Sequence, residues 1–515
     1  MKAEGDRVQD ATETCVAWAF TNSGMIAFQL VSRRSWSTHV GYRTTGEIGT
    51  GNWYFTAPWT PVALRRGDPL GLRAGADYFA DLLAPGLSNG TSDARWITLL
   101  SWCLKWSHTV WQKAQGGDLS TRDAQRARYA WLRPLELLWI ARALQSGQND
   151  GQLRGRRSVE RWLASNGRLA DFAMNPEQFR RYRQIGTYGA YRVAFRSLPG
   201  LADDNGWTPG SKALALANIV NESLPNDARL EEAHFERGTR WGVWREHNKA
   251  ARYWIEHGWA NWHIEPGQGL LPTKNSDIWK PVTRAERDIL APSIFGDDSV
   301  RRTVIEVLSR AKSPKSHADL CRELAHSSTL AEALARNPAR TSAPPAASLV
   351  VLPPFTDLAD AAMAAMRLLW VAINQDGEEQ APAIEKLARS EELRTGIDQL
   401  RMASETWLKE TKRRAFPHHE TADRLALAMT GATSTTLAQI RALVEHHQRQ
   451  GGGRRWFHEK AGKLVPLVAN TGIAASDYRF RLRPLCLLAA QCKAADMTRV
   501  KGIFTGEQQD EEVLS

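Results

Sequence analysis

The sequence is poor in cysteine, and its cysteines are not paired. Five cysteines are spread over the 515 residues without any C-x-x-C spacing, at Cys15, Cys103, Cys321, Cys486 and Cys492. Structural zinc sites and redox-active pairs need cysteines at short, regular spacing. We therefore expect reduced, mostly buried thiols in a reducing compartment, without a structural zinc site. We expect no other metal and no cofactor either.

Long apolar runs are also lacking. No stretch approaches the roughly 18 consecutive apolar residues that a membrane helix needs. The N-terminal segment MKAEGDRVQD has no apolar core of the kind found in signal peptides. The sequence therefore predicts a cytoplasmic protein that has no membrane partner.

Several familiar catalytic signatures are missing as well. The glycines at positions 46, 49 and 51 do not have the G-x-G-x-x-G spacing, and no Walker lysine follows them. The chain has neither a PD-(D/E)xK nor an HNH pattern, and the histidines between residues 247 and 263 share no H-x-x-x-H spacing. These absences disfavour a nucleotide-binding loop and a metal-dependent nuclease.

Positive charge and tryptophan, in contrast, are abundant. Lysine and arginine outnumber aspartate and glutamate by 67 to 56, which gives a formal net charge of +11, and 18 of the 21 tryptophans precede residue 280. Many soluble proteins are mildly basic, and most tryptophans belong to a core. However, a basic chain attracts polyanions, and nucleobases stack on indole rings. We therefore expect a nucleic acid, DNA in particular, as the partner.

The hydrophobic periodicity predicts a mainly α, multi-helical protein with a few short strands or hairpins. We divide it into a Trp-rich N-terminal domain of helices and loops (1–150), which holds the candidate site, and a basic helical region (151–333). The Pro/Ala/Ser-rich segment 334–348 is a predicted linker. A C-terminal helical bundle follows (349–515). Within the first domain, residues 1–60 are expected to be irregular, with one short strand near Trp53.

Two local patterns indicate smaller modules. A predicted helix from Tyr188 to Leu198, a turn at Asp203–Gly206 and a second helix that opens at Thr208-Pro209 resemble a winged helix-turn-helix, which binds DNA or packs against a partner. Near the C-terminus, GGGRRWFHEKAG predicts a hairpin that turns at Ala461-Gly462.

One stretch, Asp68 to Trp111, combines several features of a site. A helix is predicted over residues 70–84 and ends at Pro85-Gly86. The turn from Pro85 to Thr91 then leads directly to Asp93, Arg95 and Trp96. An acid, a base and an aromatic ring beside exposed backbone N–H groups suit a reaction site. They equally suit a helix start, in which Ser88 or Thr91 is the cap and Asp93 lies in the first turn.

The same stretch carries a family resemblance. Its motifs are Leu70-Gly71-Leu72-Arg73, Ala76-Asp77, Pro85-Gly86-Leu87-Ser88 and Ala94-Arg95-Trp96, with Trp102 beyond them. They resemble a broad group of bacterial proteins of unassigned function that occur near phage-defence genes. The resemblance extends to similarity with a defence DNA glycosylase that excises glucosylated hydroxymethylcytosine from phage DNA. It assigns no role to a particular residue.

A base-excising enzyme needs a carboxylate near the anomeric carbon, a pocket for the flipped base, and cations for the phosphates. The candidate carboxylates are Asp93, Asp68 and Glu47, with Glu136 as a rival that is more simply explained as half of a buried Arg–Glu pair. The candidate pocket residues are Trp53, Trp96 and Trp102 for the base, and Asn52, Asn89 and Ser88 for sugar hydroxyls. The candidate nucleic-acid contacts are Arg73, Arg95, Arg454, Arg455 and Trp456.

Two questions stay open at the level of sequence. The Arg-Arg-Trp-Phe segment at 454–457 is either a flexible loop that wedges between bases or the approach to an edge strand whose aromatic rings are buried. The protein as a whole is either an antiviral DNA glycosylase that leaves abasic sites, or a non-enzymatic DNA-binding subunit of a phage-defence complex.

Overall fold

The computed structural model describes most of the chain from residue 68 onward and one earlier pair of strands. The described ranges are 14–21, 24–31, 68–114, 118–145, 156, 159–160, 186–224, 226, 229–235, 271, 278–297, 299–336, 345–374, 382–432, 435–450, 455–467 and 480–504. The chain forms two compact units, Met1–Ala63 and Leu64–Ser515. The finer division at residues 150, 333 and 348 stays a prediction.

The first unit contains an antiparallel pair of strands. β1 (Thr14–Thr21) pairs with β2 (Gly24–Val31) in a register that joins Thr14 to Val31 and Thr21 to Gly24. The prediction of irregular structure is therefore wrong for this segment. The signal was present, because TCVAWAFT and GMIAFQLV are two eight-residue apolar runs separated by two turn-forming residues. The strand predicted near Trp53 lies outside the described residues.

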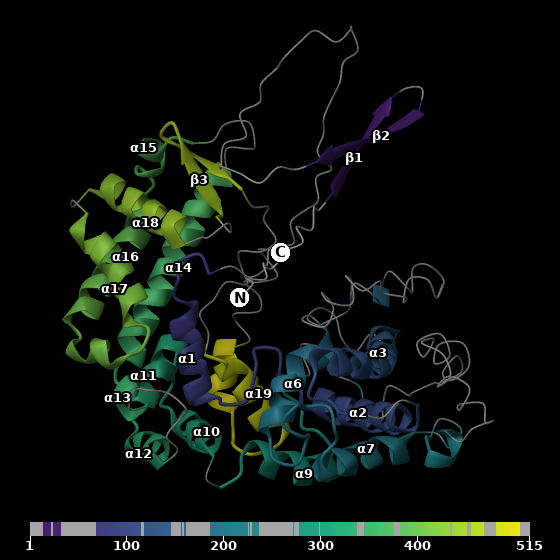
Figure 1. The fold of residues 1–515 in the computed structure, drawn as a ribbon. Helices are drawn as coiled ribbons and strands as arrows, with labels where there is room; N and C mark the ends of the chain where they lie inside the picture. Colours follow the sequence, from purple (N-terminus) through teal and green to yellow (C-terminus); the bar gives the residue numbers. More distant parts are fainter. Residues whose placement is uncertain are drawn as a thin grey trace, which may run out of the picture. The chain divides into compact units, whose positions relative to one another are not determined.

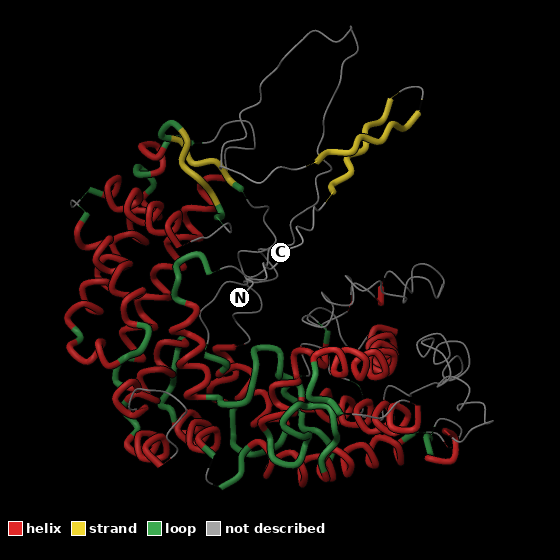
Figure 2. The backbone as a smooth tube through the Cα atoms, in the orientation of Figure 1, coloured by secondary structure: helices red, strands yellow, loops and turns green. Residues whose placement is uncertain are grey.

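The second unit is helical from its first element, as Figure 2 shows, so the mainly α prediction is confirmed. Its early helices are α1 (Arg73–Leu83), α2 (Ala94–Ala114), α3 (Arg122–Gln145), α6 (Thr187–Ser197) and α7 (Ser211–Ser223), with the short 3₁₀ helix η3 (Glu232–Phe235). The long apolar helix α2 packs on α3 and α7. α3 is continuous through Pro134.

The middle of the unit consists of shorter helices that begin at side-chain caps. They are α9 (Arg284–Ile294), α10 (Val300–Arg310), α11 (His317–Ala325), α12 (Ser328–Arg336) and α13 (Pro345–Leu349). Thr283 and Glu286 form a capping box before α9, and Ser316 and Asp319 form another before α11. Both ends of the predicted linker are helical, in α12 and α13, while residues 337–344 lie outside the description.

The C-terminal part consists of long and short helices with one two-stranded hairpin. Its elements are α14 (Leu352–Asn374), α15 (Ile384–Leu387), α16 (Glu391–Lys409), the 3₁₀ turn η8 (Thr411–Ala415), α17 (His419–Gly431), α18 (Thr436–Gln450), β3 (Phe457–Lys460), β4 (Lys463–Pro466) and α19 (Leu482–Gln491). α14, α16 and α17 pack side by side (Figure 1). α14 is strongly apolar along its length, with the sequence LPPFTDLADAAMAAMRLLWVAIN.

The predicted hairpin near the C-terminus is confirmed with its turn. β3 and β4 are antiparallel, and the pair Lys460↔Lys463 closes the ladder. The two residues between them, Ala461 and Gly462, have φ angles of 51° and 73°. Two successive left-handed residues form the primed turn that matches the twist of a two-residue hairpin.

The winged helix-turn-helix is not confirmed. α6 and α7 lie where the sequence places its two helices, and the turn between them is closed by a single bridge, Ala202↔Pro209. No β-hairpin accompanies this pair of helices among the residues that the structure describes. We therefore treat α6 and α7 as part of the common helical core.

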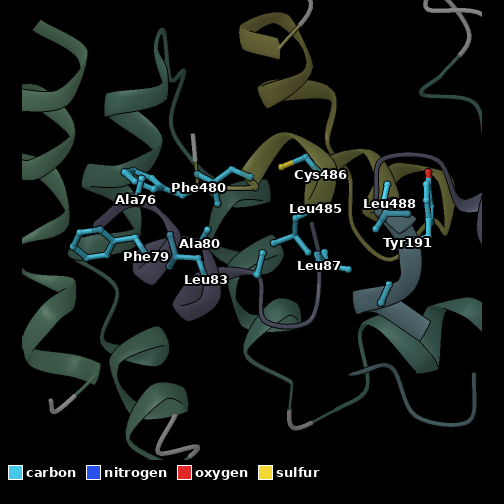
Figure 3. Close-up of a cluster of buried hydrophobic side chains, with 14 of the residues drawn as sticks. Ala76, Phe79, Ala80, Leu83, Leu87, Tyr191, Phe480, Leu485, Cys486 and Leu488 are labelled. Atoms are coloured by element: carbon cyan, nitrogen blue, oxygen red, sulfur yellow. The ribbon is translucent and has the colours of Figure 1, made fainter. Parts of the chain in front are cut away.

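One continuous apolar core joins the early and late helices. Phe79, Ala80 and Leu83 of α1 and Leu485 and Cys486 of α19 belong to this one cluster (Figure 3). All five side chains are buried. None of the described helices combines the length and apolarity needed to cross a membrane.

Candidate functional site

Asp93, the first candidate acid, begins helix α2. Its Oδ1 accepts a hydrogen bond from the backbone N–H of Arg95 at 2.9 Å and lies 3.7 Å from the Arg95 guanidinium. The side chain is buried, and its negative charge lies at the positive end of the helix dipole. Asp93 is thus the cap of α2, and the expectation that Ser88 or Thr91 has this role is wrong.

Most N–H groups of the turn before Asp93 are bonded within the protein. Ser88 and Thr91 bond to each other, and the Ser88 hydroxyl donates to the carbonyl of Ala190 in α6 at 2.6 Å. Four N–H groups of the turn and its end donate to side chains. Ser88 N donates to Thr91 Oγ1 (3.2 Å), Gly90 N to Ser88 Oγ (3.2 Å), Asp93 N to Tyr191 Oη (3.0 Å) and Ala94 N to Gln491 Oε1 (2.7 Å). The turn is therefore a joint between α2, α6 and α19 rather than an anion cradle.

Gly86 shows how closely this joint is packed. Its φ of 74° is left-handed, and a Cβ added there would lie 2.5 Å from the Cβ of Ser197. Only glycine tolerates both conditions. The Pro-Gly-x-Ser motif therefore follows from the close approach of the turn to the end of α6.

The other described carboxylate candidates also bind backbone N–H groups. Asp68 accepts from Leu72 N and Arg73 N, each at 2.9 Å, and so caps α1. Glu136 is fully buried in α3, where it accepts from Thr187 N at 2.6 Å and from Tyr129 Oη at 3.3 Å. Each carboxylate compensates polar groups that would otherwise lack partners at a helix start or in the core.

The candidate aromatic residues are in the core. Trp96 and Trp102 are 3% and 1% exposed, and the Trp102 ring packs edge-on against Trp139 at 5.9 Å. Trp456 is 3% exposed, and its backbone N–H donates to His447 Nε2 at 3.0 Å. The structure thus agrees with the alternative interpretation of the Arg-Arg-Trp-Phe segment, in which the aromatic rings are buried. To act as a wedge, Trp456 would have to leave this position.

The remaining candidates are scattered. Arg73 is the half-buried first residue of α1, Asn89 is exposed at the tip of the turn, and Arg455 is exposed just before β3. Glu47, Asn52, Trp53 and Arg454 lie outside the described residues. The structure brings Asp93, Arg95 and Trp96 together at one helix start, and it places Asp68 at the start of a different helix.

A residue that the sequence analysis did not single out, Gln491, organises the surroundings of this helix start. Its fully buried amide accepts from Ala94 N, and its Nε2 donates to Ser92 O at 3.3 Å and to Ile278 O at 2.6 Å. Arg95 donates to the Pro281 carbonyl at 3.0 Å. The segment 278–282 is therefore held between the start of α2 and the end of α19.

This segment forms one wall of an open cavity of about 420 Å³. Trp279, which is half-buried, and the exposed Lys493 and Lys501 supply its aromatic and cationic groups. The remaining lining residues are Ala490, Ala495, Asp496, Met497 and Thr498. Its volume lies within the roughly 300–1,000 Å³ of small-ligand pockets. We call it the Trp279 cavity.

The one acid in the Trp279 cavity is engaged locally. Asp496 Oδ1 accepts from Thr498 N at 2.9 Å and from Thr498 Oγ1 at 2.6 Å. These hydrogen bonds lower the pKa of the Asp496 carboxyl, with the hydroxyl as the larger cause. Two lysines and this one aspartate line the cavity, so the lining is net positive.

A second, larger cavity of about 630 Å³ lies between α17 and α18. Its floor is made of alanine and leucine side chains, and its rim carries Arg441, Glu445 and Arg449. Arg441 pairs with Glu385 at 2.7 Å, and Arg449 pairs with Glu445 at 2.9 Å. Because these rim charges compensate each other and no aromatic ring lines the cavity, it is less suited to an anionic ligand.

Cysteine or metal chemistry is not supported in the described part of the chain. The four described cysteines are free and buried, and burial raises the pKa of Cys486 and of Cys492 to about 12. A thiolate nucleophile needs a lowered pKa. No group of three or more His, Cys, Asp or Glu residues that could hold a metal ion occurs among the described residues.

Comparison of the chain with protein-family models, with curated proteins and with solved structures finds no match. Its function is therefore inferred from the chemistry of the residues described above.

Proposed function

We propose that this protein binds nucleic acid, DNA in particular, and that it does so at the Trp279 cavity without changing the nucleic acid chemically. The observation that carries the proposal is the indole of Trp279 in an open cavity whose other prominent side chains are Lys493 and Lys501. An indole stacks on any nucleobase, and lysine binds the neighbouring phosphates. The net charge of +11 supports the same class of partner.

The indole of Trp279 favours an unpaired base. A base inside a duplex has both faces covered by its neighbours, whereas a single-stranded or extrahelical base can lay one face on Trp279. Each stacked base contributes roughly 1–3 kcal/mol to binding. The bonds from Gln491 and Arg95 to the backbone of residues 278–281 fix the segment that carries the indole. A platform fixed in this way loses little entropy on binding.

Binding is favoured over base excision because of the positions of the acids. Asp93, Asp68 and Glu136 all accept backbone hydrogen bonds at present. For Asp93 to reach a sugar, it would have to leave the N–H of Arg95 and give up its role as the cap of α2. The antiviral glycosylase, for which Glu47 is a further candidate acid, remains a hypothesis that rests on the sequence resemblance. It can be tested with the same protein samples.

The binding test compares a labelled single-stranded oligonucleotide with the matching duplex by fluorescence anisotropy. We expect Trp279→Ala to weaken single-strand binding about 5- to 150-fold, which corresponds to the loss of one stacked base. Trp279→Phe should retain most of the affinity, because it keeps an aromatic face. Leu437→Ala, which truncates a partly buried residue of the other cavity, is the matched control and should bind like the wild type. Equal affinity of Trp279→Ala and wild type would refute the proposal.

The excision test incubates the wild type with glucosylated hydroxymethylcytosine DNA and with plain DNA. Released bases are measured by mass spectrometry, and abasic sites by alkaline cleavage. We expect neither product. Release of a base that is lost in Asp93→Asn, while this variant stays folded by circular dichroism, would establish the glycosylase instead.

A further inference from the structure

The 3₁₀ turn η8 is a second basic feature, and it lies outside the Trp279 cavity. The segment reads Glu-Thr-Lys-Arg-Arg-Ala-Phe from Glu410 to Phe416. Lys412 and Arg414 are exposed, whereas Arg413 between them is half-buried. Successive residues of a 3₁₀ helix point about 120° apart, so the middle cation can turn inward while its two neighbours stay outside.

The inward-turned Arg413 fixes the turn to the two helices beside it. Its Nε donates to Asp423 Oδ1 of α17 at 3.1 Å, and its Nη1 donates to the Glu410 carbonyl at 2.9 Å. Trp407 of α16 donates to the same Asp423 oxygen at 2.7 Å. One carboxylate therefore joins α16, η8 and α17.

The end of the turn is anchored in the core. Phe416 is fully buried and stacks on Phe79 of α1 with 4.8 Å between the ring centroids and an angle of 15° between the ring planes. Phe355 lies edge-on to it at 5.4 Å. A turn held at both ends presents its outer side chains from a rigid base.

The acids that begin η8 and flank it in α17 are engaged in hydrogen bonds. Glu410 accepts the N–H of Lys412 at 2.8 Å, and Asp423 is taken by Arg413 and Trp407. Among the described residues, Lys412 and Arg414 form no ion pair. Lys409 and Arg424 are also exposed on the helices that flank the turn. These exposed cations of η8 and its two flanking helices are defined here as the η8 patch: Lys409, Lys412, Arg414 and Arg424.

We propose that the η8 patch is a second site for the same nucleic acid, at which Lys412 and Arg414 bind backbone phosphates. This inference rests on the proposed function, because it takes nucleic acid as the ligand. Phosphate contacts of this kind add affinity without reading sequence. A membrane surface fits less well, because Phe416, the one large hydrophobic residue between 409 and 424, is buried in the core and does not offer its ring to a bilayer.

Salt dependence separates the two sites. Each phosphate contact to a single strand contributes about 0.7 to the slope of log affinity against log salt concentration. The double variant Lys412→Gln/Arg414→Gln removes two cations, so the slope should fall by about 1.4. Lys412→Arg/Arg414→Lys keeps both charges and should restore the wild-type slope. Trp279→Ala should lower the affinity and leave the slope unchanged.

The matched control is Lys312→Gln/Lys315→Gln, which removes two exposed cations beyond the end of α10. Its slope should equal that of the wild type. Equal slopes for both double variants, together with normal Trp279→Ala behaviour, would overturn the η8 inference and leave the proposed function intact. Failure of the wild type to bind any oligonucleotide would overturn both. Loss of binding to phosphatidylserine vesicles, but not to the oligonucleotide, in the η8 variant would assign the patch to membranes and overturn the inference.

Discussion

The two ends of the helical unit have interiors of opposite character. Among the described residues, every buried arginine and carboxylate except Glu286 and Arg301 belongs to the early helices or the turn before α2. The late helices α14, α16 and α17, together with α1, surround a cluster of phenyl and indole rings. The two regions of the helical unit are therefore stabilised by different interactions. Substitutions in the two interiors should change the stability differently.

Arg128 represents the polar interior. It is fully buried in α3 and donates to Ser107 Oγ and Leu104 O at 3.0 Å each and to Trp207 O at 3.3 Å. Burial lowers the pKa of Arg128 to about 9. The Arg128 guanidinium is thus stabilised mainly by neutral oxygen atoms, which belong to α2 and to the turn before α7. Stability in this region therefore depends on matched donors and acceptors rather than on volume.

Phe416 represents the apolar interior. Its ring contacts Phe79, Phe355, Trp407 and Tyr78, and two polar contacts lie among these rings, one from Trp407 to Asp423 and one between the Tyr78 and Ser348 hydroxyls. Such a cluster is stabilised by buried area and close packing. In the ring cluster around Phe416, we expect substitutions that conserve volume to have small effects on stability and substitutions that remove volume to have large ones. Around Glu136 and Arg128, even substitutions that conserve volume should lower the stability.

The largest effect is expected for Phe416→Ala. Removing the ring leaves a cavity among Phe79, Phe355 and Trp407, and such substitutions cost about 3–5 kcal/mol. Phe416→Leu keeps part of the volume and should cost clearly less. Both values come from urea unfolding followed by circular dichroism. A cost below about 1 kcal/mol for the alanine variant would mean that the ring cluster is not the packed core described here.

Acid should destabilise the late helices through His447. This residue is fully buried, its Nδ1 donates to the Pro69 carbonyl at 2.8 Å, and its Nε2 accepts from Trp456 N at 3.0 Å. Burial lowers the pKa of His447 to about 4, well below the usual value near 6.5. The unfolded chain therefore takes up a proton before the folded one does. The associated stability is present above pH 6.5 and is lost as the pH falls toward 4, by about 3 kcal/mol.

The test measures unfolding free energy from pH 7.5 to pH 4 in His447→Gln and in the wild type. The variant should be less stable at pH 7, because glutamine cannot bond to Pro69 and Trp456 at once, and its pH dependence should be flatter. His326→Gln, at an exposed histidine of the same unit, is the control. Parallel curves for His447→Gln and the wild type would exclude His447 as a source of acid lability. His108 in α2, whose pKa burial also lowers to about 4, extends the comparison to the polar interior.

Glu136→Gln tests the polar interior without changing its volume. The new amide can still accept from Thr187 N, but its NH₂ group brings two donors into a site where Tyr129 already donates. An unsatisfied buried polar group costs about 1–3 kcal/mol. Thermal unfolding should therefore show a loss of stability for a substitution that adds no volume. A neutral result would mean that packing, and not hydrogen bonding, sets the stability of both interiors.

The sequence predicted those elements whose signals are local. The helical spacing before Pro85-Gly86 and the Ala461-Gly462 turn both depend on neighbours a few residues apart. The choice of Asp93 over Ser88 as the cap of α2 did not follow, because both residue types cap helices and only the contact of Ser88 with Ala190 decides between them. Tertiary contacts outweigh local preference at such positions.

The Trp279 cavity was out of reach for a related reason. Trp279 was one of many tryptophans, and nothing in its local sequence distinguishes it. Its partners Lys493 and Lys501 follow more than 200 residues later. Gln491, which fixes the segment 278–282, belongs to no motif, because a glutamine at a helix end has no distinguishing sequence pattern. Periodicity and spacing do not predict which residues far apart in the sequence come together in the fold.

The smallest effect is expected outside both interiors, in the hairpin turn. Ala461 has a left-handed φ of 51°, a conformation that costs a β-carbon-bearing residue roughly 1–2 kcal/mol, less for asparagine, which visits it routinely. Asparagine followed by glycine is also the preferred pair in this turn. We expect Ala461→Asn to stabilise the protein by about 0.5–1 kcal/mol, measured by urea unfolding. Ala461→Val, with a branched side chain at the same φ, should destabilise it. Because neither change alters a buried contact, the change in stability measures backbone strain alone. This value gives a reference for the larger losses of stability expected from the cavity at Phe416 and from the hydrogen bonds at Glu136.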